Sequence, residues 1–225
     1  MKQTKAIFAA LAAMGLLLFA SCGNDKNNGD WVDLGLPSGL LWATCNLGAN
    51  APEEYGDHYA WGETATKSVY DYSTYKYCTV DAEGRLETLT KYNTDSDYGT
   101  TDGLTTLQAV DDVTTQKLGN GARIPTADEW RELFNNTTAE WTTMNGVNGR
   151  KFTAANGNSL FLPAAGSRWD SELYGAGEYG DYWSSSLYAG YPYDAWDFNF
   201  YSGDQGMDDD LRYYGRSVRP VRSAR

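Results

Sequence analysis

Apolar residues are distributed along this chain in two different ways. Residues 6–20 form an apolar run that is broken only by Gly15 and follows two lysines. A positively charged start and a short apolar run are typical of a signal peptide, whereas about 20 apolar residues are needed to span a bilayer. We therefore expect residues 1–21 to be removed and the polar residues 22–30 to form a flexible tether. Residues 31–225 then form a single folded domain.

From residue 31 onward, apolar and polar residues alternate in short segments that predict β-strands. Val32, Leu34 and Leu36 alternate with polar or small residues, and an extended run resumes at residues 40–44 after a Pro-Ser-Gly turn. This pattern predicts a hairpin. Residues 48–103 are rich in Gly, Asp, Thr, Ser and Tyr and show little periodicity, which predicts long loops with short strands.

A three-stranded meander is predicted in the second half of the chain. Short strand candidates are separated there by Asn-Gly pairs, which favour hairpin turns. The strands are expected at 141–144, 151–154 and 159–162, and the turns at Asn145-Gly146, Asn148-Gly149 and Asn156-Gly157. Later, Trp196, Phe198 and Phe200 alternate with polar residues as in a half-buried strand, and residues 217–221 are expected to form a closing strand.

Two helices are predicted between these strand regions. Residues 104–117 are expected to form a short helix that turns Leu107, Val110 and Val113 inward. Thr126 and Glu129 have the spacing of a capping box, in which each side chain binds a free backbone amide at the start of a helix. The helix that follows turns three apolar side chains to one face and is expected to end near residues 135–136; these side chains are Trp130, Leu133 and Phe134.

The composition restricts the partners of the domain. The chain has 30 acidic and 18 basic residues and a formal net charge of −12, so its surface repels nucleic acid and anionic headgroups and attracts cations. It also has 17 tyrosines, 8 tryptophans and 24 glycines. This mixture favours short strands and long loops whose aromatic rings close a small core or line a binding face.

Three cysteines are present, and two of them lie in the expected mature domain. The run that ends at Cys22 resembles the lipobox of bacterial lipoproteins, which implies a diacylglycerol on that thiol and anchoring to a membrane outside the cytoplasm. The acidic and Asn-rich stretch after Cys22 resembles tethers that send lipoproteins to the cell surface, so we expect an outer-membrane protein that faces outward, with a periplasmic orientation as the alternative. Cys45 and Cys78 then lie in a compartment where disulfides persist. Either these two cysteines pair, or each is an independent buried thiol.

Seven segments, in the right order, resemble the Fibrobacter succinogenes major paralogous domain, a family of bacterial surface and secreted proteins. The segments are 32–39, 41–46, 59–63, 123–130, 160–166, 182–186 and 217–222. The resemblance implies an α+β fold similar to C-type lectins and sulfatase-modifying factors, in which a small twisted antiparallel β core with two short helices supports long loops. One departure is Ala122, where the family leads us to expect a tryptophan.

The sequence contains no recognisable catalytic constellation. His58 is the only histidine, and no Gly-x-Ser-x-Gly segment is present, which argues against a nucleophile–histidine triad. Sulfatase-modifying factors that act as oxidases use paired cysteines near the C-terminus, but no cysteine follows Cys78 in this chain. We therefore expect no catalysis, with an unrecognised hydrolase or oxidase of the sulfatase-modifying-factor type as an alternative.

Calcium is the one cofactor that the sequence suggests. Asn93, Asp95 and Asp97 alternate oxygen-bearing side chains as calcium loops do, but the glycine and glutamate positions of an EF-hand are not matched. These residues are the metal candidates. Residues 208–210 form a second acidic cluster, for which a solvated loop is the alternative interpretation.

Large aromatic residues are concentrated between residues 169 and 214, interleaved with Asp, Asn, Ser and Gly. Rings beside hydrogen-bonding groups suit sugar faces and peptide partners. The candidate ligand-binding residues are Asp197, Asn199, Tyr201, Tyr188, Tyr191, Tyr193, Trp183 and Trp196. We expect a lipid-anchored, non-catalytic binding module that recognises a glycan or a surface protein; a structural or accessory role in a surface assembly is the alternative.

Overall fold

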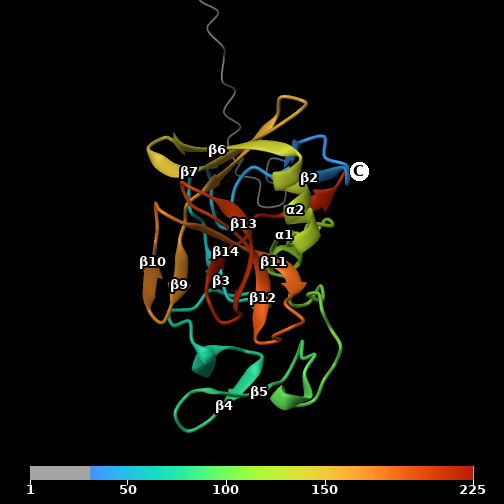
Figure 1. The fold of residues 1–225 in the computed structure, drawn as a ribbon, viewed down its shortest axis with the longest axis vertical. Coiled ribbons are helices and arrows are strands. Elements are labelled where there is room, and N and C mark those ends of the chain that lie inside the picture. Colours follow the sequence, from blue (N-terminus) through green and yellow to red (C-terminus); the bar gives the residue numbers. More distant parts are fainter. Residues whose placement is uncertain (1–30, 225) are drawn as a thin grey trace, which may run out of the picture.

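The computed structural model describes residues 31–224, and most of its regular structure is β-strand (Figure 1). The expected signal peptide, tether and lipid-bearing Cys22 lie outside these residues. The strands are β1 (Trp31–Asp33), β2 (Leu40–Ala43), β3 (His58–Tyr59), β4 (Cys78–Val80), β5 (Leu86–Leu89), β6 (Thr137–Met144), β7 (Val147–Ala154), β8 (Ser159–Pro163), β9 (Ser167–Trp169), β10 (Glu172–Tyr174), β11 (Gly180–Leu187), β12 (Asp194–Phe200), β13 (Gln205–Leu211), β14 (Arg216–Ser217) and β15 (Val221–Ser223). The helices are α1 (Val113–Leu118), α2 (Ala127–Asn135) and the 3₁₀ turns η1 (Tyr72–Thr74) and η2 (Ser96–Tyr98).

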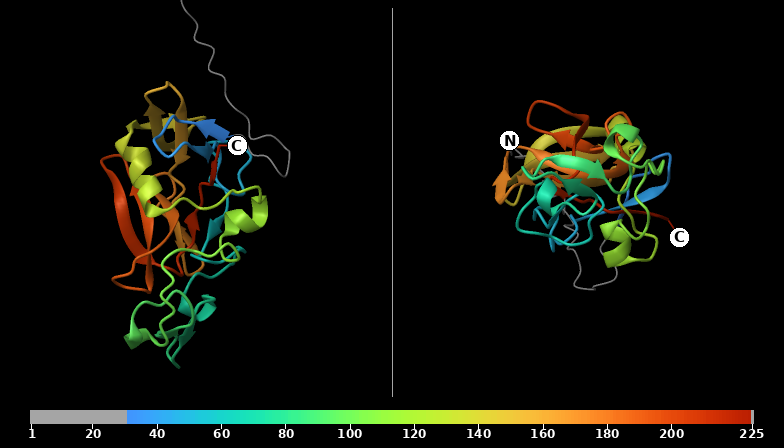
Figure 2. Two further views of the ribbon diagram at one scale, coloured as in Figure 1. Left: turned by 90° about the vertical axis from the view of Figure 1, so that its right-hand side faces the viewer. Right: turned by 90° about the horizontal axis from the view of Figure 1, so that it is seen from below.

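The strands form several small sheets, so the expected α+β class is confirmed. The largest sheet has the order β13-β12-β11-β14-β3. Two three-stranded sheets, β6-β7-β8 and β1-β2-β15, lie at one end of the molecule, while the β4-β5 hairpin projects at the other (Figures 1 and 2). The hairpin β9-β10 stands beside the largest sheet.

Helix α2 forms where the capping box predicts it. The Thr126 side chain accepts a hydrogen bond from the Glu129 amide, and the Glu129 side chain accepts one from the Thr126 amide. Trp130 and Leu133 are fully buried, and the Trp130 ring stacks on Phe198 of β12 with centroids 4.9 Å apart. The helix therefore fixes one face of the largest sheet against the core.

The first predicted helix begins nine residues later than expected, at Val113. The Leu107 amide donates to the Ser185 carbonyl, and the Leu187 amide donates to the Thr105 carbonyl, so this stretch runs beside β11 instead of coiling. Val110 is 64% exposed, which contradicts its predicted inward position. Asp112 then starts α1 by accepting from the Thr115 amide.

The predicted hairpin and meander are both confirmed. Strand β1 pairs antiparallel with β2, and β7 pairs antiparallel with both β6 and β8. The pair Asn145-Gly146 forms the β6–β7 turn with positive φ at both residues. The predicted turn at Asn148-Gly149 is wrong, because both residues lie inside β7. A Cβ on Gly149 would lie 2.3 Å from the Leu162 carbonyl oxygen, so this glycine serves close strand packing.

The predicted closing strand is divided between two sheets. Strand β14 pairs in parallel with β11, whereas β15 pairs antiparallel with β2. Pro220 lies between them and cannot donate to a ladder. The C-terminal segment therefore joins the largest sheet to the β1-β2 sheet.

Of the alternatives left open for Cys45 and Cys78, a disulfide between the two is excluded, because Cys78 is a free thiol. Its sulfur donates to the Tyr72 carbonyl at 3.2 Å, within the projecting end of the molecule. Cys45 follows β2, which lies at the opposite end (Figure 1). In residues 31–224, no helix is long and apolar enough to cross a membrane.

Arg219 lies at the junction between the sheets. Its side chain is fully buried and donates to Asn46 Oδ1, the Ala43 carbonyl and the Phe161 carbonyl, each at 3.0 Å. Burial lowers the pKa of this guanidinium to about 10. One side chain thus joins the end of β2, strand β8 and the C-terminal segment.

We expect Arg219→Gln to lower the free energy of unfolding by about 3 kcal/mol. The shorter amide leaves at least two buried acceptors without a donor, at roughly 1–3 kcal/mol each. Denaturant titration followed by tryptophan fluorescence measures the change. The matched control is Arg85→Gln at an exposed hairpin, expected to change stability by at most about 0.5 kcal/mol. Equal effects of the two substitutions would contradict the role of Arg219.

Candidate functional site

One face of the largest sheet carries an unusual number of carboxylates. Residues opposite each other on neighbouring strands point to the same face. The register pairs Asp181 with Asn199, Asp197 with Asp208, and Ala195 with Asp210. The other face carries Tyr182, Phe198 and Phe200, which pack into the apolar core. The acidic face is therefore turned away from α2.

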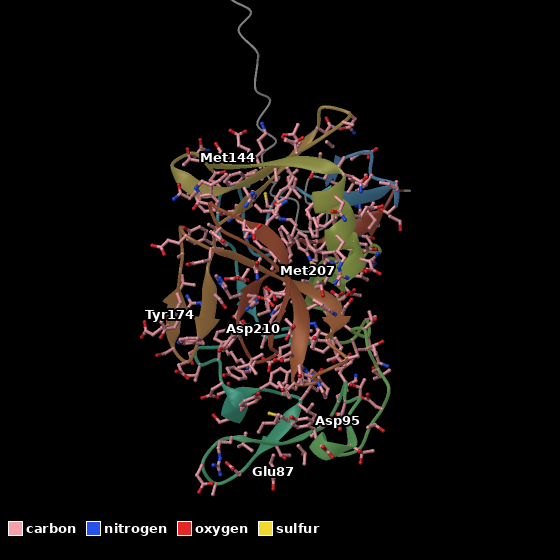
Figure 3. All side chains as sticks on the ribbon, viewed as in Figure 1. Glu87, Asp95, Met144, Tyr174, Met207 and Asp210 are labelled. Carbon is pink, nitrogen blue, oxygen red and sulfur yellow. The ribbon has the colours of Figure 1, made fainter. Side chains whose placement is uncertain are left out.

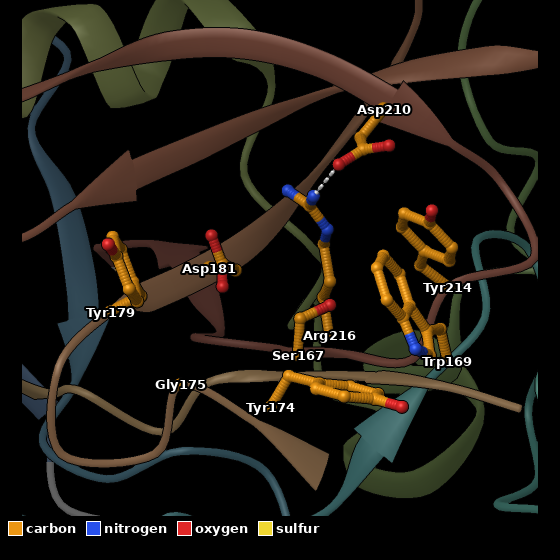
Figure 4. A pocket seen from close by; sticks show the side chains of 9 residues that line it. All are labelled: Ser167, Trp169, Tyr174, Gly175, Tyr179, Asp181, Asp210, Tyr214 and Arg216. Carbon is orange, nitrogen blue, oxygen red and sulfur yellow. Dashed lines mark hydrogen bonds and ion pairs between the residues drawn. The ribbon is translucent and has the colours of Figure 1, made fainter. Parts of the chain in front are cut away.

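A cavity of about 250 Å³ lies between this acidic face and the β9-β10 hairpin (Figure 4). The hairpin and the segment after it supply the aromatic rim, and strands β11, β13 and β14 supply the polar floor. The lining residues are Ser167, Trp169, Tyr174, Gly175, Tyr179, Asp181, Asp210, Tyr214 and Arg216.

The rim presents aromatic rings to solvent. The Trp169 ring lies 4.6 Å from that of Tyr174 and 5.6 Å from that of Tyr214, measured between centroids. Trp169 and Tyr174 are each 44% exposed, although large aromatic side chains are usually more buried. These rings lie close enough together to form one wall of the cavity, and they are exposed enough for a ligand to contact them.

The rim is held in place by backbone contacts. Arg168 and Gly215 exchange hydrogen bonds of 2.7 and 2.9 Å between their main chains, which ties β9 to the segment before β14. Gly166 has a φ of +67°, and a Cβ there would lie 2.1 Å from the Tyr174 carbonyl oxygen. This close approach requires glycine and sets where the hairpin begins.

Arg216 forms the centre of the floor. Its guanidinium makes ion pairs with Asp197 and Asp210 and lies over the Trp183 ring, 4.9 Å from the centroid. Burial alone lowers the pKa of Arg216, but the carboxylates of Asp197, Asp181 and Asp210 outweigh it and raise the pKa. The side chain is 5% exposed, and within residues 31–224 its Nε has no hydrogen-bond partner.

Asp181 lines the cavity beside Arg216 without a hydrogen bond from any residue that the structure describes. Burial raises the pKa of its carboxyl, although the Arg216 charge acts in the opposite direction. The floor therefore offers an acceptor without a donor at Asp181 and a donor without an acceptor at Arg216 Nε. A buried polar group without a partner is unfavourable unless a ligand or water supplies one.

The structure corrects two of the predicted ligand-binding residues. Asp197 lies on the predicted non-core face of β12 but is fully buried beneath Arg216, so it supports the floor and is not a surface contact. Trp183 is also buried, and its indole nitrogen donates to the Tyr59 carbonyl. Asn199 lies on the same face and donates to Asp208 at 3.4 Å.

The remaining predicted aromatic residues form a second group, which is separate from the cavity lining. The Tyr191 ring lies 5.8 Å from Tyr188 and 5.7 Å from Tyr193, and the Tyr188 ring lies 4.8 Å from Trp196. Tyr201 directly follows β12, and its ring lies 6.1 Å from that of Tyr179 at the cavity rim. Only Tyr201 adjoins the cavity among the predicted tyrosines.

Sequence reasoning missed most of the cavity. Its floor residues Asp181 and Arg216 are 35 positions apart in the chain and meet only through the parallel pairing of β11 and β14. The rim residues lie in strands of three residues, too short to show a period. One available signal was the concentration of Trp169, Tyr174 and Tyr179 around glycine-rich turns.

The side chains of the calcium candidates form hydrogen bonds within their own loop. The Asn93 side chain is buried and accepts from the Asp95 amide at 3.1 Å, and the Asp95 side chain accepts from the Asp97 amide at 2.9 Å. Figure 3 places Asp95 at the projecting end, away from Asp210. Among residues 31–224, no three His, Cys, Asp or Glu side chains are grouped to hold a metal ion. His58 is buried, with Nε2 3.3 Å from the Ala165 and Gly166 carbonyls.

Comparison of the chain with protein-family models, with curated proteins and with solved structures found no match.

Asp194, at the start of β12, lies near the acidic face and has a perturbed titration. Burial and the neighbouring Asp209 and Asp210 raise its pKa to about 7, against the opposing effect of Arg212. Its side chain is buried, and Oδ1 has no hydrogen-bond partner within the described part of the chain. Since an unfolded aspartate has a pKa of about 4, the folded state binds more protons between about pH 4 and 7.

We expect Asp194→Asn to stabilise the protein above pH 7 and to give no such gain near pH 4. The free energy of unfolding contributed by Asp194 falls as pH rises through this window, because the folded state must then carry a buried charge. Denaturant titrations at both pH values measure the difference. Glu140→Gln, on the exposed side of β6, is the control whose effect should not depend on pH in this way. A gain for Asp194→Asn that is equal at both pH values would contradict the assignment.

Proposed function

We propose that this chain is a non-catalytic binding module of the bacterial cell envelope, and that its cavity holds one sugar unit of a glycan. The observation that carries the proposal is the combination of an exposed aromatic rim with a floor that has both an unsatisfied acceptor and an unsatisfied donor. The other parts of the proposal, the lectin-like fold and the lipid anchor, rest on the sequence resemblances.

The rim suits the apolar face of a sugar ring. The C–H groups of a sugar pack against an aromatic ring while its hydroxyls stay free to form hydrogen bonds. Trp169 and Tyr174 offer two such rings at the mouth of the cavity. At about 250 Å³ the cavity is smaller than the roughly 300–1,000 Å³ usual for drug-sized ligands, which favours a single sugar unit over a longer segment.

The floor suits hydroxyl groups. A hydroxyl both donates and accepts hydrogen bonds, so neighbouring hydroxyls can donate to Asp181 and accept from Arg216 Nε. No catalytic step is proposed for this pair, because Arg216 engages the Asp210 carboxylate and leaves Asp181 as the one free carboxylate among the lining residues. A retaining or inverting glycosidase needs two carboxyl groups, one on each side of the scissile bond.

The sequence resemblances support a C-type lectin-like arrangement displayed outside the cell. Several small sheets, two short α-helices and a cavity framed by a hairpin are compatible with that fold. We propose that Cys22 carries the lipid that holds the domain at the outer membrane. The tyrosine group of Tyr188, Tyr191 and Tyr193 supports an alternative ligand, a surface protein, since tyrosine is enriched in protein interfaces.

We expect Cys22→Ala to abolish lipid labelling and to release the protein from the membrane fraction, because the thiol is the acceptor for the lipid. Metabolic labelling with a fatty-acid analogue and fractionation of the host cells measure the two effects. Cys78→Ala is the control and should leave both unchanged. Membrane retention of the unlabelled Cys22 variant would contradict the anchor.

We expect soluble residues 31–225 to bind a defined set of glycans on a broad array, and Trp169→Ala to weaken the affinity for the best of them about 30-fold. This loss is typical of an aromatic anchor that contributes about 2 kcal/mol. Titration calorimetry measures the affinity, with calcium and with chelator. Tyr191→Ala is the matched control, because Tyr191 is 53% exposed but lies outside the cavity.

Two outcomes would contradict this proposal. Loss of binding in Tyr191→Ala, with full binding in Trp169→Ala, would transfer the site to the tyrosine group. A blank array with folded protein would remove glycan binding and favour the protein-ligand alternative.

A further inference from the structure

Resting on the proposed glycan function, we infer that the cavity selects a sugar unit that carries a protonated primary amine. Neutral, N-acetylated and acidic sugars would then be weaker ligands. The inference follows from the charge of the floor, from the position of the rings and from the unsatisfied groups, each of which restricts the ligand in a different way.

The floor has more carboxyl groups than basic groups. Asp181, Asp197 and Asp210 surround Arg216, which is the one basic residue among the lining residues that the structure describes. Arg216 pairs with Asp197 and Asp210 and makes no hydrogen bond to Asp181. A ligand ammonium at Asp181 would form a charge-assisted hydrogen bond with the ionised carboxyl. A carboxylated sugar would add a further negative charge beside it.

The position of the rings requires a ligand larger than a free ammonium. Figure 4 shows the Trp169, Tyr174 and Tyr214 rings gathered around one part of the cavity and Asp181 across from them, with Arg216 in between. A ligand that packs an apolar face on the rings and places an ammonium at Asp181 therefore needs a body between the two, which a sugar ring supplies.

Arg216 indicates that the ligand is more than a simple amine. Its buried side chain lines the cavity, and its Nε finds no acceptor within residues 31–224. An ammonium has only donors, so it can satisfy Asp181 but not this N–H. A sugar bearing a hydroxyl next to the amine supplies both, because the hydroxyl oxygen accepts from Nε while the amine donates to Asp181.

The raised pKa of Asp181 agrees with this role. Burial makes the ionised carboxyl unfavourable in the empty cavity, and a bound ammonium would remove that penalty and lower the pKa. Binding of the amine should therefore weaken as pH falls and Asp181 becomes protonated.

Three trisaccharides that differ only at C2 test the inference on soluble residues 31–225. They are the β-1,4-linked trimers of glucosamine, N-acetylglucosamine and glucose, whose substituents are ammonium, acetamide and hydroxyl. Calorimetric titration at pH 6 is expected to give an affinity for the glucosamine trimer about tenfold above the other two, as for one charge-assisted hydrogen bond. Propylammonium is added as a sugar-free amine and is expected to bind more weakly than the glucosamine trimer.

The substitution Asp181→Asn keeps the shape of the side chain and removes its charge. It should abolish the preference for the glucosamine trimer while leaving the thermal unfolding transition cooperative. Asp208→Asn is the matched control, since it makes the same change on the same face outside the cavity lining and should keep the preference within about twofold. Loss of the preference in both variants would show a general charge effect and would overturn the assignment to Asp181.

The remaining outcomes separate the inference from the proposed function. Equal affinities for the three trimers, or a preference for the acetylated one, would overturn the amine inference and leave glycan binding intact. Binding of propylammonium as tightly as the glucosamine trimer would overturn the sugar part of the inference. Failure of all three trimers overturns the inference, and the glycan array then decides the proposed function by itself.

Discussion

Three arginines buried near the C-terminus hold this structure together. Arg212, Arg216 and Arg219 are 1%, 4% and 0% exposed and lie within eight residues of one another. A guanidinium presents five N–H donors in a fixed plane, so burying it is tolerable only where acceptors already stand in the right places. Each of these side chains meets acceptors from segments far away in the sequence. Contacts with the rest of the domain therefore hold the C-terminal segment in place.

Arg212 shows how this constraint reaches the projecting end of the molecule. Its guanidinium donates to the Lys91, Tyr92 and Pro192 carbonyls and to the Tyr75 hydroxyl. A second polar centre, Asp111, completes that region by accepting hydrogen bonds from its neighbours Tyr77, Tyr92 and Lys91. Although burial alone would raise the pKa of Asp111, these hydrogen bonds lower it to about 2.

The sequence predicted those elements that depend on residues close together in the chain. The capping box of α2 and the Asn145-Gly146 turn depend on residues within a few positions, and both form as predicted. Long-range pairings were not predicted. Residues 104–112 were predicted to be helical, but residues 105–107 pair with β11, and Asn148-Gly149 has the composition of a turn but lies in a strand. In both places tertiary hydrogen bonds override the local preference.

The candidate site was harder to predict for the same reason. The alternation in β12 correctly assigned Phe198 and Phe200 to the core, but Asp197, which it predicted to face outward, is fully buried. Nothing in the alternation indicates that Arg216, from another strand, covers Asp197. The rim needs three segments, which are brought together by the Arg168–Gly215 pairing and by the close approach at Gly166. A single sequence records neither contact.

The three buried arginines differ in the groups that their guanidinium N–H atoms contact. The guanidinium groups of Arg212 and Arg219 donate to carbonyl, amide and hydroxyl oxygens and make no hydrogen bond to a carboxylate among the described residues. Arg216 is instead surrounded by carboxylates, and burial, with smaller contributions from the neighbouring Asp210 and Asp208, raises the pKa of Asp181. A raised carboxyl pKa means that the folded state is less stable at neutral pH than an uncharged floor would make it. Arg216 differs from the other two arginines in pairing directly with carboxylates, and this arrangement supports the ligand site proposed above.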